Sequence, residues 1–209
     1  MKRILIPIGE KGSFQRAGES IQAGQLIAFP TDTVYGLGAS PYNASAIEAL
    51  YAAKGRIMSK AIPILIGDLS HIEKVALALP EPLRRLADAF WPGPLTLILK
   101  RHPDLPRDLS GLATVGVRIP DHDGARLLLQ QTGPLAVTSA NRSGSVEPRR
   151  AGDVLEELGD AVSVVLDGGM TPGGIPSTVI AFEHGGLVVH RNGPLSRDRL
   201  EKVLQGGNY

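Results

Sequence analysis

Two threonines near the start of the chain stand where a predicted strand ends. The segment FPTDTVYGLG occupies residues 29–38 and carries Thr31 and Thr33. Because side chains alternate along an extended backbone, the two hydroxyls face one way and Asp32 faces the other. Short hydroxyls beside backbone amides can bind a small polar molecule.

Two cations follow these threonines in the sequence. A predicted helix over residues 43–53 leads directly to Lys54 and Arg56. With both cations facing the threonine hydroxyls, the pocket suits a small polar substrate beside a phosphate group. The alternative is an ordinary strand, loop and helix with two solvated cations, because short motifs also occur by chance.

Polar residues also accompany two later apolar strands. Ser139 and Asn141 follow the apolar residues 135–137, and their short side chains suit nucleotide or phosphate oxygens, or a simple turn. Arg118 lies within the apolar segment 115–119, where an unpaired charge is costly. Its anionic partner is either an aspartate of the protein or the carboxylate or phosphate of a ligand.

A glycine-rich segment and a late arginine complete the candidate groups. Residues 167–178 read DGGMTPGGIPST and join two predicted strands. This segment either brings its backbone close to a ligand or simply connects the strands. Arg191 ends a later strand and by itself indicates nothing.

Composition excludes several familiar chemistries. The 209 residues include no cysteine, so the chain has no disulfide, thiolate metal site or cysteine nucleophile. They also lack a P-loop, a strand followed by GxGxxG, an HExxH motif and a GxSxG elbow. With 22 basic and 21 acidic residues the net charge is +1, so any RNA contact requires a local patch.

The start of the chain carries no targeting signal that we recognise. Its basic head is followed by an apolar run that is too short for a signal peptide and is interrupted by Pro7. No apolar run reaches the ~18–20 residues of a membrane span. We therefore expect a cytoplasmic protein with no membrane partner.

Helical and extended patterns alternate along the whole chain, which favours an α/β fold. We expect a single domain over residues 1–209, with a twisted mixed sheet, flanking helices and a concave substrate cavity. A hairpin around His184 supplies antiparallel pairing. Helices are predicted over residues 13–23, 43–53, 70–79, 81–90, 124–131, 151–158 and 196–204, and strands over 2–8, 26–29, 62–66, 95–100, 115–119, 135–139, 162–167, 177–182 and 187–191.

Six motifs, taken in order, resemble the YrdC/TsaC family of L-threonylcarbamoyladenylate synthases in its short, single-domain type. They are FPTDTVYGLG, KGR (54–56), WPGPLT (91–96), VRIP (117–120), TSAN (138–141) and the glycine-rich segment, and the match spans roughly residues 12–204. The chain departs from the family at Ile57, where proline is usual, at Ala61 and Ile62 in place of Pro-Leu, and at Asn192 within the usual Arg-Pro-Gly. These departures put the shape of the loop over residues 57–63 in question.

The resemblance implies that ATP, L-threonine and bicarbonate (or CO2) give threonylcarbamoyl-AMP and pyrophosphate, the first step of the t6A modification of tRNA. Mg²⁺ is expected with ATP, held by phosphates and water and by no protein side chain. Further implied partners are tRNA itself and the downstream tRNA threonylcarbamoyltransferase complex. By positional match, the catalytic residues are Lys54 and Arg56; Thr31, Arg118 and Ser177 contact threonine or its carbamate; and Lys54, Arg56, Thr114, Ser139, Asn141 and Arg191 contact the nucleotide.

Two alternatives stay open. One is a carbamoyl-transfer domain of the hydrogenase-maturation type, which in that family is fused to acylphosphatase and zinc-finger segments. This chain has neither the length nor any cysteine for those segments. The other is a non-catalytic module that binds double-stranded RNA or tRNA, because members of the family have a positively charged concave face.

Overall fold

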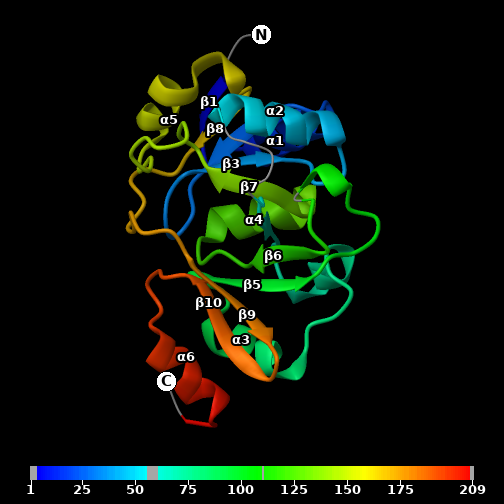
Figure 1. Cartoon of the computed structure of the whole chain (residues 1–209). Helices are drawn as coiled ribbons and strands as arrows, with labels where there is room; N and C mark the ends of the chain where they lie inside the picture. The colour runs from blue at the N-terminus through cyan, green and yellow to red at the C-terminus, as the bar shows by residue number, and fades with distance from the viewer. Residues whose placement is uncertain (1–3, 56–60, 110, 208–209) are drawn as a thin grey trace.

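Ten strands form one mixed sheet in a computed structural model that describes residues 4–55, 61–109 and 111–207. The strand order is β1-β8-β2-β3-β7-β4-β6-β5-β9-β10, with parallel and antiparallel pairs along its length. In Figure 1 the sheet descends from the N-terminal strands at the top to the β9–β10 hairpin at the bottom. The predicted mixed α/β fold is confirmed.

Helices and strands alternate as the sequence pattern indicates. The strands are β1 Ile4–Pro7, β2 Ile27–Phe29, β3 Gly36–Ala39, β4 Ile64–Leu65, β5 Leu95–Lys100, β6 Thr114–Arg118, β7 Leu135–Ser139, β8 Val164–Asp167, β9 Thr178–Glu183 and β10 Gly186–Arg191. The α-helices are α1 Ser13–Gln22, α2 Ala44–Lys54, α3 Glu81–Phe90, α4 Asp123–Thr132, α5 Ala151–Leu158 and α6 Arg197–Leu204, with short 3₁₀ turns at Leu69–Lys74, Arg107–Leu109 and Gly159–Ala161.

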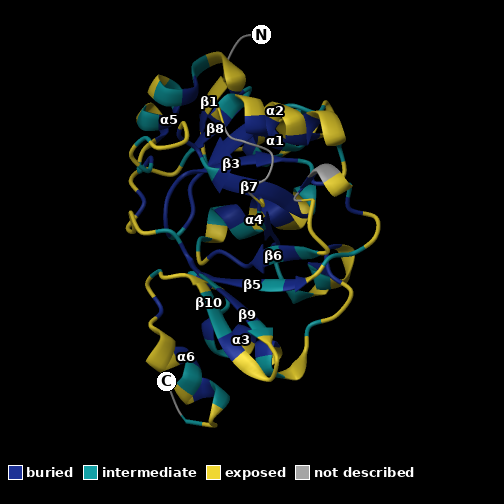
Figure 2. Ribbon diagram, in the orientation of Figure 1, coloured by how far each residue is buried: buried dark blue, intermediate teal, exposed yellow. Residues whose placement is uncertain are grey.

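Both faces of the sheet are covered. Along β2, Ile27 and Phe29 belong to one hydrophobic cluster and Ala28 to the other, because successive side chains point to opposite faces. Residues of α1 and α4 complete the smaller cluster, and residues of α2, α3, α5 and α6 complete the larger one. Figure 2 shows the central strands buried and the outer helix faces exposed. A sheet buried on both sides leaves its strand ends as the places for polar chemistry.

Helix α2 is bounded by clear signals at both ends. The side chain of Asn43 accepts a hydrogen bond from the Ala46 amide (3.1 Å) and caps the start of the helix. Gly55 ends the helix in the left-handed region, at φ 58°. Lys54 is therefore the last helical residue, and its position is fixed by the helix.

The secondary structure differs from the prediction by one missed strand and one shortened helix. Strand β3 is absent from the predicted strands, because Gly36 and Gly38 carry no β signal. A Cβ on Gly36 would lie 2.6 Å from Val137 Cγ1, so β3 needs glycine to pair with β7. The helix predicted through residue 79 ends as a 3₁₀ turn at Lys74, because Leu77 donates its amide to Lys100 O (3.0 Å) and pairs with the end of β5.

The predicted hairpin is confirmed. Strands β9 and β10 are antiparallel, with Glu183 opposite Gly186. His184 and Gly185 form the two-residue turn with positive φ values of 52° and 79°, as tight hairpins require.

Among the described helices, none has the length and apolar character to cross a bilayer.

Candidate active site

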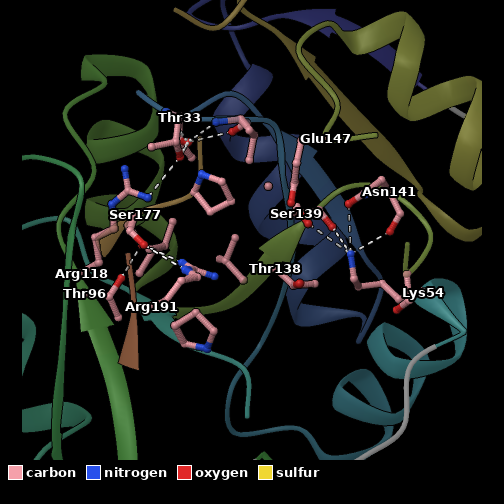
Figure 3. Close-up of a pocket in the computed structure, with 18 of the residues that line it drawn as sticks. Thr33, Lys54, Thr96, Arg118, Thr138, Ser139, Asn141, Glu147, Ser177 and Arg191 are labelled. Atoms are coloured by element: carbon pink, nitrogen blue, oxygen red, sulfur yellow. Dashed lines mark hydrogen bonds between the residues drawn. The ribbon is translucent and has the colours of Figure 1, made fainter. Parts of the chain in front are cut away.

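A cavity of about 420 Å³ opens where several strands end, a volume within the range of small-molecule sites. Most residues that the sequence singles out line it, although they come from segments far apart in the chain. These residues are Thr31, Lys54, Arg118, Ser139, Asn141, Ser177 and Arg191. Figure 3 labels all of these except Thr31 and shows the labelled ones around one space, with Lys54 and Asn141 on one side and Arg118, Ser177 and Arg191 on the other.

The two threonines after β2 build a tight turn at the cavity floor. Thr31 Oγ1 donates to Val34 O (2.7 Å) and accepts from the amides of Thr33 (3.1 Å) and Val34 (3.2 Å). The two threonine hydroxyls lie 3.0 Å apart and share a hydrogen bond. Thr31 thus fixes the turn, and both buried hydroxyls line the cavity. The expectation that Asp32 faces away from the hydroxyls is wrong, because the backbone turns here and Asp32 and Thr33 both contact Arg118.

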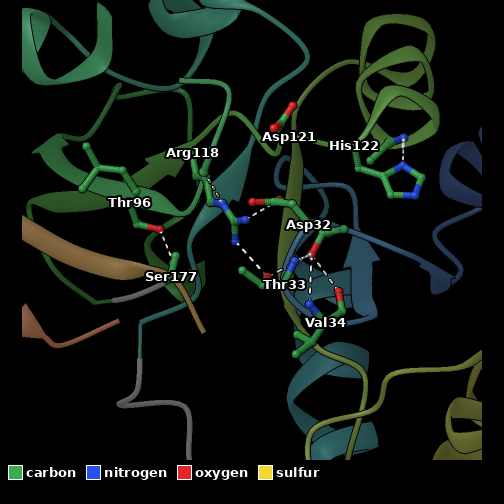
Figure 4. A network of polar contacts seen from close by, with 12 residues as sticks. Asp32, Thr33, Val34, Thr96, Arg118, Asp121, His122 and Ser177 are labelled. Atoms are coloured by element: carbon green, nitrogen blue, oxygen red, sulfur yellow. Dashed lines mark hydrogen bonds and ion pairs between the residues drawn. The ribbon is translucent and has the colours of Figure 1, made fainter. Parts of the chain in front are cut away.

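Arg118 is held by groups of the protein on three sides. Its Nε donates to Gly93 O (2.9 Å), its Nη1 donates to Thr33 Oγ1 (3.2 Å), and its Nη2 forms an ion pair with Asp32. Burial lowers the pKa of Arg118, and the Asp32 charge opposes that shift. Of the two partners that the sequence allows, the structure shows the aspartate (Figure 4). Two N–H groups of the guanidinium have no contact among those just described, and Arg118 lines the cavity.

Lys54 ties the end of α2 to the segment after β7. Its Nζ donates to Ser139 O (2.5 Å) and Asn141 O (2.7 Å), with longer contacts to Ser139 Oγ (3.4 Å) and Asn141 Oδ1 (3.3 Å). The Lys54 carbonyl also accepts the amide of Ser143 (2.9 Å). Only 4% of Lys54 is exposed. A buried ammonium therefore holds Ser139 and Asn141, two of the residues predicted to contact the nucleotide.

The opposite wall carries a chain of hydroxyl and guanidinium contacts. Ser177 Oγ lies 2.8 Å from Thr96 Oγ1, and Arg191 donates its Nη2 to Ser177 Oγ (3.1 Å) and its Nε to Ser177 O (3.0 Å). Thr96 and Ser177 are buried, whereas Arg191 is exposed at the rim. The arginine at the end of β10 is thereby oriented across the mouth of the cavity.

Two predicted residues do not join this group. Arg56 lies outside the described residues. Thr114 begins β6 opposite Lys100, four positions from Arg118 and therefore about 13 Å along the strand. It is not among the residues that line the cavity, so its place on the nucleotide side stays a prediction.

The cavity also contains residues that sequence reasoning did not select. Thr96 is a lone hydroxyl within the apolar strand β5, which is a weak signal. Thr138 belongs to the TSAN motif, and Arg142 follows it directly. Glu147 lies in an irregular segment between β7 and α5 with no periodicity to mark it. Across the described residues, no group of three or more His, Asp or Glu side chains could hold a metal ion.

Comparison with known proteins identifies the family of this chain. The family model for Sua5/YciO/YrdC, described as telomere recombination, matches residues 19–193. The chain belongs to the Sua5/YciO/YrdC family. The match includes every residue of the cavity, and the family resemblance expected from the six motifs is confirmed.

Several members of the Sua5/YciO/YrdC family are similar over most of this chain. The threonylcarbamoyl-AMP synthase of Bacillus subtilis (strain 168) is 38% identical, over 90% of this chain and 56% of that protein. The putative threonylcarbamoyl-AMP synthase of Mycobacterium tuberculosis (strain H37Rv) is 41% identical, over 88% of this chain and 86% of that protein. The structure of Pyrococcus abyssi Sua5 with L-threonine superposes with a TM-score of 0.91 at 38% identity, covering 96% of this chain and 60% of that one. This Sua5/YciO/YrdC chain thus spans little more than half of two relatives and most of the third.

Proposed function

We propose that the protein is a threonylcarbamoyl-AMP synthase that uses L-threonine, bicarbonate or CO2, and ATP. The observation that carries the proposal is the convergence of seven predicted residues, from Thr31 to Arg191, on one cavity. The names of the two synthases and the threonine bound to Pyrococcus abyssi Sua5 support the choice of substrates. Neither an RNA-binding module nor a hydrogenase-maturation domain is favoured by these comparisons.

The proposed reaction is a nucleotidyl transfer. The amine nitrogen of threonine forms a bond to the carbon of CO2 and loses a proton, which gives a carbamate. A carbamate oxygen then attacks the α-phosphorus of ATP, and the bond from that phosphorus to pyrophosphate breaks. No protein nucleophile is needed, so the protein contributes alignment and neutralisation of charge.

The cavity supplies those contributions from its two walls. On one wall, Lys54 holds Ser139 and Asn141 in place for the nucleotide and adds positive charge. On the other wall, Arg191 lies at the rim for the triphosphate, beside the Ser177 hydroxyl that we assign to threonine. Removal of one charged contact of this kind typically slows turnover by about 10²–10³-fold.

The remaining assignments belong to the same proposal. Thr31 and Arg118 contact threonine or its carbamate, and Arg56 joins Lys54 as a catalytic cation. Mg²⁺ arrives with ATP and is bound through phosphate oxygens and water. The product passes to a tRNA threonylcarbamoyltransferase, with or without direct contact to tRNA.

The test is an incubation of the protein with ATP, L-threonine and bicarbonate in the absence of RNA. We expect pyrophosphate release that requires threonine and bicarbonate, and a mass spectrum that contains threonylcarbamoyl-AMP. Binding of RNA without threonine-dependent pyrophosphate release would contradict the proposal and support the RNA-binding module.

A further inference from the structure

Glu147 places a carboxylate oxygen in the cavity wall without a partner. Its Oε2 atom is shielded from solvent and has no hydrogen-bond partner among the described residues, although the residue lines the cavity. An ionised carboxylate can only accept hydrogen bonds, and a buried acceptor without a donor is unfavourable. A ligand that donates an N–H group would remove that penalty.

The backbone around Glu147 determines where its side chain points. The carbonyl of Ser145 accepts from Asn141 Nδ2 (2.7 Å), and the carbonyl of Pro148 accepts from the amide just before β3 (2.9 Å). Between these two anchors, Val146 is 88% exposed and Glu147 turns inward. An exposed valine beside an inward-facing glutamate contradicts ordinary burial preferences, and such local conflicts concentrate at functional sites.

The other charged residues that line the cavity are all cations. Arg118 pairs with Asp32, and Arg191 binds Ser177. Arg142 also lines the space, as does Lys54, so Glu147 is the one acid among the described lining residues. Figure 3 shows its side chain extending into the space that the cations surround.

The charges of the proposed substrates match this arrangement. ATP, bicarbonate and the carboxylate of threonine are negative and suit the four cations. The ammonium of threonine is the one positive group of these three substrates, and a single carboxylate in a cationic site selects it. We propose that Glu147 binds the ammonium group of the amino-acid substrate and holds its nitrogen beside the carbon that it attacks. The ammonium first transfers one proton to bicarbonate, which splits into CO2 and water, and the resulting amine attacks CO2 and loses a second proton to solvent. This inference rests on the proposed function, because it requires an amino acid in the cavity.

Calorimetry with a matched pair of ligands tests this role. L-Threonine is compared with 2,3-dihydroxybutanoate of the same configuration, in which a hydroxyl replaces the amino group. We expect Glu147→Gln to weaken threonine binding by about 10–100-fold. The affinity for the deaminated compound changes by less than about 3-fold, because the lost contact is absent from it.

The control variant is Glu156→Gln, which removes the same charge from an exposed position on α5 and leaves both affinities unchanged. Glu147→Asp, which keeps the charge on a shorter side chain, gives an intermediate loss of threonine affinity and replaces the glutamine variant if that variant unfolds.

Equal losses of affinity for both ligands would overturn the assignment. A change in the Mg²⁺ dependence of ATP binding, in place of a loss of threonine affinity, would also overturn it. Unchanged threonine binding by Glu147→Gln would overturn the assignment as well. In each of these cases, threonine binding by the wild-type protein leaves the proposed function standing. If the wild-type protein binds no threonine, the proposed function itself fails.

Discussion

Replacement of Lys54 by methionine separates the positional role of its ammonium from the packing of its stem. Methionine keeps most of the buried chain and removes the charged nitrogen. The carbonyls of Ser139 and Asn141 then lose the donor that lies 2.5 and 2.7 Å away. Because Lys54 is 4% exposed, water does not readily replace that donor.

The size of the effect follows from these contacts. A hydrogen bond to a charged group contributes about 1.5–3 kcal/mol. The two bonds share one ammonium and are not additive, and the cost of burying the charge disappears with it. We expect Lys54→Met to lower the free energy of unfolding by about 2–4 kcal/mol. For a chain of this size that corresponds to a fall of about 5–15 °C in Tm.

Two measurements check the reasoning on one protein preparation. Thermal unfolding followed by circular dichroism gives the Tm, and threonine-dependent pyrophosphate release gives turnover, which we expect to fall by about 10²–10³-fold. Lys11→Met removes an exposed ammonium and should leave Tm within about 2 °C. If Lys54→Met loses activity but keeps its Tm, the ammonium does not stabilise the fold through Ser139 and Asn141. Its role would then be to bind the phosphates alone.

Three further changes probe the surroundings of the cavity. Asp32→Asn leaves the buried Arg118 without an opposing charge and should cost about 3–5 kcal/mol in urea unfolding; a loss below about 1 kcal/mol would contradict the pairing. Gly173→Ala places a Cβ 2.6 Å from a backbone oxygen and should cost about 1–3 kcal/mol, whereas Gly152→Ala meets nothing within 4 Å and should be neutral or stabilising; equal effects would refute the close approach. Burial lowers the pKa of His122, so the unfolded chain binds the proton more tightly and stability falls as the pH drops below 6.5. His122→Asn can still cap α4 and should flatten the dependence of Tm on pH between about 7.5 and 5.5. Parallel curves of Tm against pH for the variant and the wild type would exclude this histidine as the cause.

Elements with a strong local pattern are predictable from the sequence to within a residue. The apolar run of β5 and the proline break after α3 mark both elements, because burial of these residues agrees with their intrinsic preference. Strand β3 is not predictable in this way. Gly36 is required by contact with Val137, which lies far along the chain and which local sequence does not reveal.

The same distinction applies to the site. Motif residues such as Ser139 and Ser177 are found from their resemblance to a family, and the structure brings them to one cavity. The partner of Arg118 stays open in the sequence because Asp32 is separated from it by 86 positions. Glu147 has no motif and no periodicity, and only its buried, unpartnered oxygen in three dimensions identifies it.

The position of β8 between β1 and β2 has a consequence for how the protein is made. Among the described strands β1 pairs with β8 alone, so residues 4–7 have no such partner until the ribosome has synthesised residues 164–167. Ser177 and Arg191 emerge later still. The nascent chain therefore exposes an incomplete sheet edge until residues 164–167 have emerged, and such edges attract other chains. The cavity gains its last described lining residue only when Arg191 has been synthesised.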